Sequence, residues 1–426
     1  MADIPFPRGV RDLMPNEALF RNEVLRKLEE VYRRFGYLTI DTPTFESVKV
    51  LKAKNAIGED TKLIYELKYE DLALRYDFTV SLARYVSMHQ NLPLPFKRFA
   101  IGKAWRREEP QKLRYREFTQ ADVDIVGGRA GATDAEVIAV SSICLQTLGI
   151  EYTVQINNRK LVEAYLAAVG IKPELVMPVM RAVDKLDKIG RDGVIEMLGK
   201  AGLSRDQVTK VDALVNLDGT NDEKLSYIEK MVKEKESISE LREMLELLKL
   251  YELKGPVNID FSLMRGFDYY TGTVFEHKAA DKSVRGSLGG GGRYDNLIGI
   301  YSGAKTIPAV GSSLGIDRLL DIMSFSSSPK QTYAEVFIVT VKDKNYRYAL
   351  QTANLMRSQG VFVDLNMSTR NIANQLSYAN SLKFKYAIII GDSEEGSNKL
   401  KMRNLVDGTE LTLGLEEVLK VLKEGK

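Results

Sequence analysis

The chain has 426 residues, 44% of them hydrophobic, and its 61 Lys and Arg against 58 Asp and Glu leave a net charge of +3. This length predicts two or three compact units, and the balanced charge excludes bulk basicity as the basis for binding a polyanion. A single cysteine, Cys144, excludes an internal disulfide framework and a cysteine-based zinc site, and two histidines argue against a zinc or two-metal centre.

The first 170 residues predict one long helix followed by antiparallel strands. Apolar residues at three- and four-residue steps predict a helix after Pro15, capped by Asn16 and ended at Gly36. Alternating residues predict a hairpin over 63–77 and a second hairpin over 96–128. The N-terminus has no signal-like apolar core and no apolar run could span a bilayer, so we expect a cytoplasmic protein without a membrane segment.

The rest of the chain changes pattern twice. Residues 171–254 show helical periodicity dense in Lys and Glu, which predicts an all-α insertion with a solvated charged face. Antiparallel β patterns return over 255–326, and beyond a Ser-rich linker strands alternate with helices over 332–426. The predicted fold class is therefore α+β: an antiparallel sheet flanked by helices, formed by residues 1–170 and 255–326, with a helical insertion and a C-terminal α/β domain whose sheet is mainly parallel.

One strand pattern carries polar side chains on a single face. In "YREFTQADVDIV", period-two alternation places Arg116, Phe118, Gln120, Asp122 and Asp124 together. A hydrophobic core would leave these polar groups unpaired, at a cost of about 1–3 kcal/mol each. The pattern therefore favours a polar cavity wall, and an exposed strand with salt bridges is the alternative. The arginines of the preceding loop suit contacts to phosphate.

The glycine-rich segment "SLGGGGRYDNLIG", residues 287–299, does not have the spacing of a phosphate-binding loop or of a dinucleotide fingerprint. Its four successive glycines indicate close approach of the backbone to a ligand or another strand, with Arg293 and Asp295 as structural partners. Neither His89 nor His277 stands in a setting typical of a catalytic base, so both are interpreted as structural.

Taken together, five segments resemble the class II aminoacyl-tRNA synthetases, and specifically the histidyl-tRNA synthetases. "GYLTIDTPTFES" resembles motif 1, the dimer-forming segment, "FAIGKAWRREEPQKLRYREFTQADVDIVG" resembles motif 2, and "PAVGSSLGIDRLL" resembles motif 3. "LMRGFDYYTGTVFEH" and "GSLGGGGRYDNLIG" match two signatures peculiar to the histidine enzymes. The resemblance covers nearly the whole chain.

The resemblance implies a histidine–tRNA ligase. Such an enzyme activates histidine with ATP and Mg²⁺, giving histidyl-adenylate and pyrophosphate, and then transfers histidine to the 3′ end of tRNA(His). The resemblance also implies a homodimer formed through motif 1 and an anticodon-binding role for the C-terminal domain. No protein residue is expected to act as a dedicated metal ligand.

The resemblance assigns the catalytic arginines. In this family the arginine at position 265 lies at the α-phosphate of ATP beside the histidine carboxylate, and the arginine at position 106 contacts the same groups. Charge accumulates on the phosphoryl oxygens during the reaction, so a preorganised guanidinium stabilises the transition state more than the ground state. Arg265 and Arg106 are therefore the expected catalytic residues.

The resemblance also assigns the other site residues, one position at a time. Besides Arg106, the residues expected to bind ATP are Glu108 at the adenine amino group, Arg114 at the outer phosphates, and Phe118 and Arg318 on the two faces of adenine. The residues expected to bind histidine are Asp77, Thr79, Gln120, Asp124, Tyr269 and Tyr270. The first three hold its amino end, and Asp124 and Tyr270 meet the imidazole. Gln111 is expected at the acceptor end of the tRNA.

Three other readings stay open. A regulatory subunit of ATP phosphoribosyltransferase resembles a synthetase but does not aminoacylate. Such subunits typically lack the C-terminal module and disturb the signature arginine, and both features are present here. The paired tyrosines and "GGGGRYD" argue against a prolyl or threonyl enzyme. A general RNA-binding scaffold would need a more basic surface than a charge of +3 provides. Asp77 and Asp124 stand where many relatives carry glutamate, and Glu109 and Asn374 also depart from the family pattern.

Overall fold

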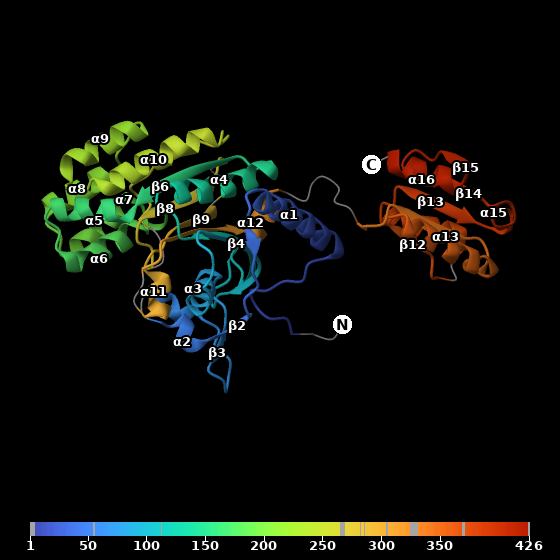
Figure 1. Cartoon of the computed structure of the whole chain (residues 1–426), viewed down its shortest axis with the longest axis horizontal. Helices are drawn as coiled ribbons and strands as arrows, with labels where there is room; N and C mark the ends of the chain where they lie inside the picture. Colours follow the sequence, from blue (N-terminus) through green and yellow to red (C-terminus); the bar gives the residue numbers. More distant parts are fainter. Residues whose placement is uncertain are drawn as a thin grey trace. The chain divides into compact units, whose positions relative to one another are not determined.

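The computed structural model of the chain describes residues 5–53, 56–111, 113–264, 269–281, 283–284, 286–303, 306–323, 331–368 and 371–424. The chain divides into two compact units (Figure 1). The larger unit comprises Met1–Arg11 and Val24–Ser324, and the smaller comprises Asp12–Glu23 and Phe325–Lys426. Within the described residues, no helix combines the length and the apolar character needed to cross a membrane.

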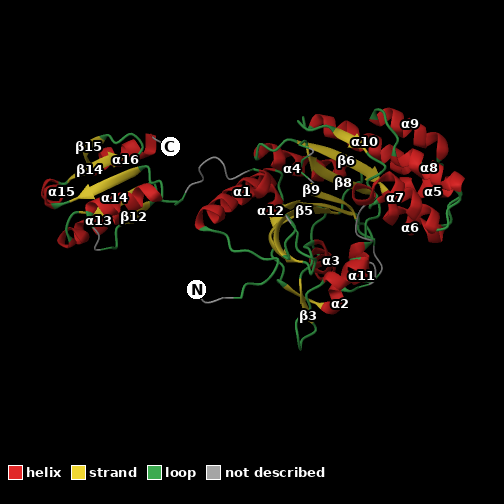
Figure 2. Cartoon of the chain, turned by 180° about the vertical axis from the view of Figure 1, so that it is seen from behind, coloured by secondary structure: helices red, strands yellow, loops and turns green. Residues whose placement is uncertain are grey.

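The larger unit is built on a twisted central sheet with helices around it (Figure 2). This sheet has eight strands in the order β1-β4-β5-β10-β9-β8-β6-β7. The parallel pairs are β1 with β4 and β6 with β7, and the other neighbours are antiparallel. This arrangement confirms the predicted antiparallel sheet. The strand bounds are Leu38–Thr39 (β1), Phe96–Trp105 (β4), Glu117–Val126 (β5), Tyr152–Asn158 (β6), Val257–Ile259 (β7), Thr273–Ala279 (β8), Ser287–Arg293 (β9) and Ala309–Gly315 (β10).

The two faces of this sheet differ in chemistry. One face is apolar and packs against α4 (Ala132–Thr147), which contacts β5, β8, β9 and β10. Val123, Ile125 and Leu314 on this face are buried. Because side chains alternate along a strand, the intervening residues of β5 point to the opposite face. That opposite face carries the polar residues and is called the polar face below.

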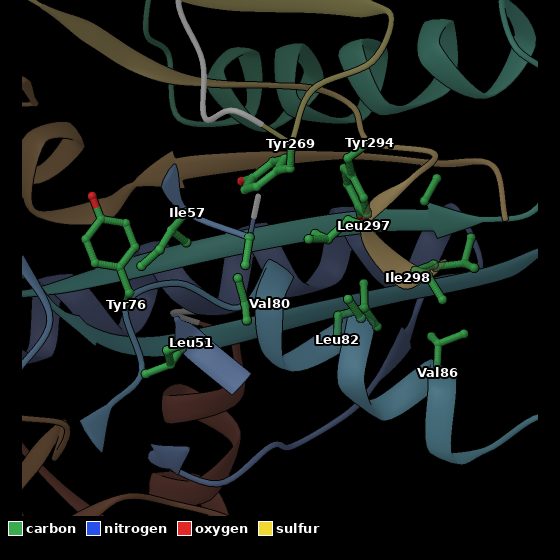
Figure 3. Close-up of a cluster of buried hydrophobic side chains, with 14 of the residues drawn as sticks. Leu51, Ile57, Tyr76, Val80, Leu82, Val86, Tyr269, Tyr294, Leu297 and Ile298 are labelled. Atoms are coloured by element: carbon green, nitrogen blue, oxygen red, sulfur yellow. The ribbon is translucent and has the colours of Figure 1, made fainter. Parts of the chain in front are cut away.

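Several helices and a two-stranded sheet accompany the central sheet. The helix predicted after Pro15 is α1 (Pro15–Arg34), which begins at Pro15, so Asn16 lies inside the helix instead of capping it. The hairpin predicted over 63–77 exists, but its second arm, β3 (Leu72–Leu74), also pairs with β2 (Phe45–Ser47), which the sequence did not indicate. The short helices α2 (Val48–Leu51) and α11 (Leu297–Ser302) and the longer α3 (Thr79–Met88) contribute to an apolar cluster with Tyr76, Tyr269 and Tyr294 (Figure 3).

Helices form the segment between β6 and β7 (Figure 1). The helical character predicted for residues 171–254 is confirmed. Ser204 with Gln207 and Thr220 with Glu223 form reciprocal capping boxes, which explains where α8 and α9 begin. The helix bounds are Arg159–Ala168 (α5), Pro173–Val183 (α6), Leu186–Lys200 (α7), Arg205–Val215 (α8), Asn221–Met231 (α9) and Glu236–Leu250 (α10).

The smaller unit has a five-stranded sheet in the order β12-β11-β13-β14-β15. The prediction of a mainly parallel sheet is correct for the first three strands only, because β14 and β15 form an antiparallel hairpin that the prediction missed. Gly408, with φ of 80°, lies in its turn. The bounds are Val336–Thr340 (β11), Tyr346–Ser358 (α13), Val363–Leu365 (β12), Ile372–Ser381 (α14), Tyr386–Ile390 (β13), Asp392–Ser397 (α15), Lys399–Asn404 (β14), Glu410–Gly414 (β15) and Leu415–Glu424 (α16).

Candidate active site

The polar face of β5 is buried. Gln120, Asp122 and Asp124 are 9%, 3% and 1% exposed, and the register places them opposite Gly315, Ser313 and Gly311 of β10. The alternation predicted from sequence therefore brings these three polar side chains together on one face. Burial of this kind is costly unless the groups find partners within the protein or in a ligand.

Asp124 is held by two partners from distant parts of the chain. Arg98 of β4 lies directly across the strand pair, with its Nη2 2.6 Å from Asp124 Oδ2, and the Tyr294 hydroxyl donates to Asp124 Oδ1. Burial raises the pKa of Asp124, against the opposing effects of Arg98 and Tyr294. A Cβ at Gly311 would collide with this carboxylate, so only glycine leaves room for it.

Asp77 and Thr79 lie where the chain enters α3. Asp77 is 3% exposed, and its Oδ1 accepts a hydrogen bond of 3.0 Å from the Val80 N–H in the first turn of α3. Arg98 also donates to the Phe78 carbonyl at 3.3 Å, so one buried guanidinium links the Asp77 segment to Asp124. Burial raises the pKa of Asp77.

Asp122 and Gln120 share Ser313 as a neighbour. The Gln120 Nε2 donates to the Ser313 Oγ at 2.8 Å, and the Ser313 hydroxyl favours the ionised form of the neighbouring Asp122 carboxyl, which lowers its pKa. Burial raises the pKa of Asp122 to about 7, opposed by Arg98 and reinforced by Asp124. The sequence placed Asp122 on this face but did not assign it a role.

The paired tyrosines pack edge-on beside Tyr294. The Tyr269 ring centroid lies 4.8 Å from that of Tyr270 and 5.9 Å from that of Tyr294. A Cβ at Gly292 would lie 2.8 Å from the Tyr270 ring, so the glycine of β9 makes room for that ring. Figure 3 shows Tyr269 and Tyr294 together beside Leu297. The glycine-rich signature thus leaves the space that the tyrosines of the other histidine signature occupy.

Arg293 fixes the segment that carries the tyrosines. Its guanidinium pairs with the buried Asp134 at 2.6 Å and with Asp295 at 3.0 Å, which confirms the predicted partnership of Arg293 and Asp295. The backbone N–H of Asp295 donates to Thr271 Oγ1 at 3.0 Å, and the Thr271 N–H donates to the Arg293 carbonyl at 2.8 Å. This network ties the residue after Tyr270 to β9 and to α4.

Arg106 follows β4 and lies against two aromatic rings. Its guanidinium carbon is 4.4 Å from the Tyr76 ring centroid and 5.0 Å from the Phe118 centroid. Its Nε donates to the Tyr76 carbonyl at 3.4 Å. These contacts restrict the arginine to one side of the motif 2 hairpin, next to the aromatic residue expected to stack on adenine.

Glu108 and Arg114, expected at opposite ends of ATP, are ion-paired at 2.7 Å in this structure. Binding of ATP as the family resemblance implies would therefore require this pair to open. Gln111 lies at the exposed tip of the loop, where its backbone exchanges hydrogen bonds of 3.2 and 2.9 Å with Arg114. Arg318 of α12 (Ile316–Ile322) donates through Nη1 to the Ser287 carbonyl at the start of β9.

The N-terminal segment 8–11 packs on the motif 2 loop, which the sequence did not predict. Arg11 pairs with Asp317 at 3.0 Å and lies 4.6 Å over the Tyr115 ring, while Asp317 also accepts from the Thr119 N–H at 2.7 Å. The Gly9 carbonyl accepts from the Arg116 N–H at 2.7 Å. The segment thus joins the loop to the helix that carries Arg318.

Two parts of the expected site, the arginine at position 265 and the metal ion, stay predictions. Arg265, the expected catalytic arginine, lies outside the described residues, so its role stays a prediction. No group of three or more His, Cys, Asp or Glu side chains in the described part of the chain is arranged to hold a metal ion.

His277 gives the fold a defined acid sensitivity. It is fully buried on β8, with Nε2 3.0 Å from Ser142 Oγ, and burial lowers its pKa from 6.5 to about 4. Between pH 6.5 and 4 the unfolded chain therefore binds a proton at His277 that the folded chain excludes. The contribution of the neutral, buried His277 to the free energy of unfolding is fully present above pH 6.5 and is lost as the pH falls towards 4. The full loss is roughly 3 kcal/mol.

We expect His277→Gln to flatten this dependence of the thermal unfolding midpoint on pH, because glutamine keeps a hydrogen-bonding group near Ser142 without titrating. Calorimetry across this pH range provides the measurement. His89→Gln is the matched control, because His89 is exposed at the end of α3 and its substitution should leave the wild-type dependence intact. A wild-type pH dependence in His277→Gln would contradict the assignment.

The larger unit thus combines a mainly antiparallel sheet, an arginine-bearing strand–loop–strand, a glycine strand and a following helix with Arg318. These features define the catalytic domain of a class II aminoacyl-tRNA synthetase. Residues 9–319 match the family model of histidyl-tRNA synthetase, and residues 335–425 match the anticodon binding domain. The chain therefore belongs to the histidyl-tRNA synthetase family.

Individual relatives agree with this membership. The histidine–tRNA ligase of Korarchaeum cryptofilum is 38% identical over 432 residues, which cover 98% of this chain and 100% of the relative. The crystal structure of histidyl-tRNA synthetase from Nostoc sp. PCC 7120 has a TM-score of 0.87 at 27% identity, with 100% of both chains covered. A Bacillus halodurans structure titled as an ATP phosphoribosyltransferase regulatory subunit/histidyl-tRNA synthetase has a TM-score of 0.76 at 22% identity, over 91% of this chain and 98% of that one, and shares the fold alone.

Proposed function

We propose that the chain is a histidine–tRNA ligase that joins histidine to the 3′ end of tRNA(His) in two steps. In the first step, a carboxylate oxygen of histidine attacks the α-phosphorus of ATP, the bond from that phosphorus to the bridging oxygen breaks, and pyrophosphate leaves. In the second step, a hydroxyl of the terminal adenosine attacks the carbonyl carbon of histidyl-adenylate, and AMP leaves.

The observation that carries this proposal is a set of buried acceptor atoms near and on the polar face. Within the described residues, Asp77 Oδ2, Gln120 Oε1 and Asp122 Oδ1 have no hydrogen-bond partner. An unpaired buried acceptor costs about 1–3 kcal/mol, so a fold retains several where ligand donors complete them. Histidine brings an ammonium group and imidazole N–H donors, which match these acceptors.

Asp124 and Tyr270 are proposed to select the imidazole. The Arg98 ion pair and the Tyr294 hydroxyl hold the Asp124 carboxylate in one position, and Gly292 leaves room for Tyr270. A buried carboxylate that is fixed in this way loses a partner when the side chain of the amino acid cannot donate to it. Such a site rejects non-donating side chains strongly, which provides selection without an editing step. Tyr269 and Thr79 complete the proposed histidine site.

Arg106 and Arg265 are the groups that we assign to the reacting phosphate. Contacts with the rings of Tyr76 and Phe118 hold the Arg106 guanidinium in place before the substrate arrives, so little reorganisation is needed as charge develops. Phe118 and Arg318 are proposed to enclose the adenine. Once the pair of Glu108 and Arg114 opens, each of them could reach its own end of ATP, which would enter as a complex with Mg²⁺.

The proposed assembly and tRNA contacts rest on three further features. Leu38 and Phe45 in motif 1 are 63% and 50% exposed, which supports a homodimer formed through this segment. Gln111 at the loop tip is proposed to meet the acceptor end of tRNA.

We assign residues 1–170 and 255–326 to the catalytic domain of a cytoplasmic enzyme, 171–254 to a helical insertion, and 332–426 to anticodon binding. The match of residues 335–425 to the anticodon binding domain disfavours the regulatory-subunit alternative.

We expect the purified protein to catalyse ATP–pyrophosphate exchange with histidine and with none of the other nineteen standard amino acids. The measurement is incorporation of labelled pyrophosphate into ATP for each amino acid in turn. Charging of a tRNA(His) transcript, but not of a tRNA for another amino acid, tests the second step. Exchange with a different amino acid, or absence of exchange, would remove the proposal.

A further inference from the structure

The orientation of the Gln120 amide follows from its neighbours on the polar face. Ser313 of β10 lies directly opposite Asp122 across the strand pair, so the two side chains are neighbours on the polar face, and the Ser313 hydroxyl favours the ionised form of the Asp122 carboxyl. An ionised carboxylate only accepts, so we infer that the single Ser313 proton points towards this neighbour. The Ser313 oxygen then accepts from Gln120 Nε2 at 2.8 Å. This leaves Gln120 Oε1 as the unengaged end of the amide among the described residues.

We propose that Asp122 is a positioning residue for histidine binding, which acts through Ser313 to present the carbonyl oxygen of Gln120 to the substrate ammonium group. This inference rests on the proposed function, because it takes the ammonium group as the ligand of Gln120. Asp122 itself adds negative charge beside that position. Neither Asp122 nor Ser313 is among the residues that the family resemblance assigns to the site.

The burial of Asp122 supports a role in ligand binding over a role in packing. Its side chain is 3% exposed, and its Oδ1 has no partner within the described residues. The charged neighbours that act on it are Arg98 of β4, Asp124 of β5 and Asp77 before α3, and its charge acts in turn on Arg75 and Tyr270. Two of the three groups acting on it are carboxylates, so a cationic ligand would relieve repulsion that the protein alone leaves in place.

Protonation of Asp122 should reverse the hydrogen-bond directions from Asp122 through Ser313 to Gln120. A neutral carboxyl group can donate to Ser313, whose proton can then point to Gln120 and favour the opposite amide orientation. Because the pKa of Asp122 is raised to about 7 by burial, the ionised form that orients Gln120 correctly predominates above that pH and is lost below it. Histidine affinity in the wild type should therefore fall as the pH drops through this value, beyond any change due to the titration of histidine itself.

The test uses two ligands that differ in the ammonium group. Histidinol keeps the ammonium and imidazole groups, and imidazolepropionate keeps the imidazole and the carboxylate but has no ammonium. We expect Asp122→Asn and Ser313→Ala each to raise the KM for histidine and the inhibition constant of histidinol about 10-fold, as for loss of one charge-assisted hydrogen bond. The inhibition constant of imidazolepropionate and the kcat of exchange should change by less than about 3-fold.

Ser312→Ala is the matched control, because Ser312 is the next residue of β10 and points to the opposite face of the sheet. It should leave both inhibition constants at wild-type values.

The ratio of the KM of Asp122→Asn to the wild-type KM should be largest at high pH and should approach one as the pH falls below 7. Taking this ratio at each pH cancels the titration of histidine, which both enzymes share.

Three results would overturn the inference. The first is an equal rise for histidinol and imidazolepropionate, which would indicate general damage to the site. The second is an unchanged inhibition constant for histidinol in Ser313→Ala. Should Asp122→Asn not fold, Ser313→Ala alone provides the test. The third is a ratio of KM values that does not vary with pH. Histidine-dependent exchange by the wild type would leave the proposed function standing in each case, whereas absence of that exchange would remove both.

Discussion

Arg265→Ala is expected to lower the rate of histidyl-adenylate formation by at least about a hundredfold, the effect of removing one preorganised donor from a developing oxyanion. The dissociation constant for ATP should change little, because the adenine and the outer phosphates have other proposed partners. Single-turnover formation of histidyl-adenylate, followed with excess enzyme, measures the chemical step directly. Equilibrium binding of ATP to the same variant measures the ground state.

Arg205→Ala is a suitable control for this experiment, because Arg205 is an exposed arginine at the start of α8. It should leave adenylate formation at the wild-type rate. Near-normal adenylate formation in Arg265→Ala would show that the role assigned to this arginine is wrong. A large loss of ATP affinity with an unchanged chemical step would instead place Arg265 at a part of ATP that does not react.

Gly291→Ala is expected to destabilise the larger unit severely. The new Cβ would collide with the carbonyl oxygen of Gly311 and lie 2.8 Å from Ser312 Cα, so β9 and β10 would have to move apart. Both contacts are with backbone, which cannot turn aside as a side chain can, and we expect a loss of at least about 3 kcal/mol. Thermal unfolding of the purified variant and its soluble yield measure the effect.

A glycine in open surroundings provides the comparison. Gly199 lies in α7, and apart from its chain neighbours and the backbone of its own helix no atom comes within 4 Å of the position that its Cβ would occupy. Gly199→Ala should therefore raise stability by about 0.5–1 kcal/mol, since alanine favours the helix. Equal stability of Gly291→Ala and the wild type would mean that β9 tolerates side chains and that its glycines serve another purpose.

The sequence predicts which residues form the polar face better than it predicts the residues that hold them in place. Alternation along β5 places Gln120, Asp122 and Asp124 on one face without knowledge of any neighbour. Arg98 and Tyr294 could not be assigned as partners of Asp124 in the same way, because they come from β4 and from the end of β9. Only the strand order and register bring them together, and local alternation specifies neither.

Two other features were missed for related reasons. The contact of Arg11 with Asp317 joins residues 306 positions apart, and no local pattern indicates it. The β14–β15 hairpin is local, and its alternation and the glycine at position 408 are visible in the sequence. It was missed because the strand and helix pattern of the preceding segment suggested that the parallel arrangement continued.

The glycine strand also constrains how this enzyme could acquire a new substrate. Residues 289–292 offer no side chain to exchange, and a Cβ at any of them would meet the main chain of a neighbouring strand. Amino-acid preference would therefore have to change at positions that flank the glycine strand and are proposed to meet the imidazole, such as Asp124 and Tyr270. We expect a saturation-mutagenesis library to return variants with altered preference from these flanks and almost exclusively unfolded protein from the glycine run.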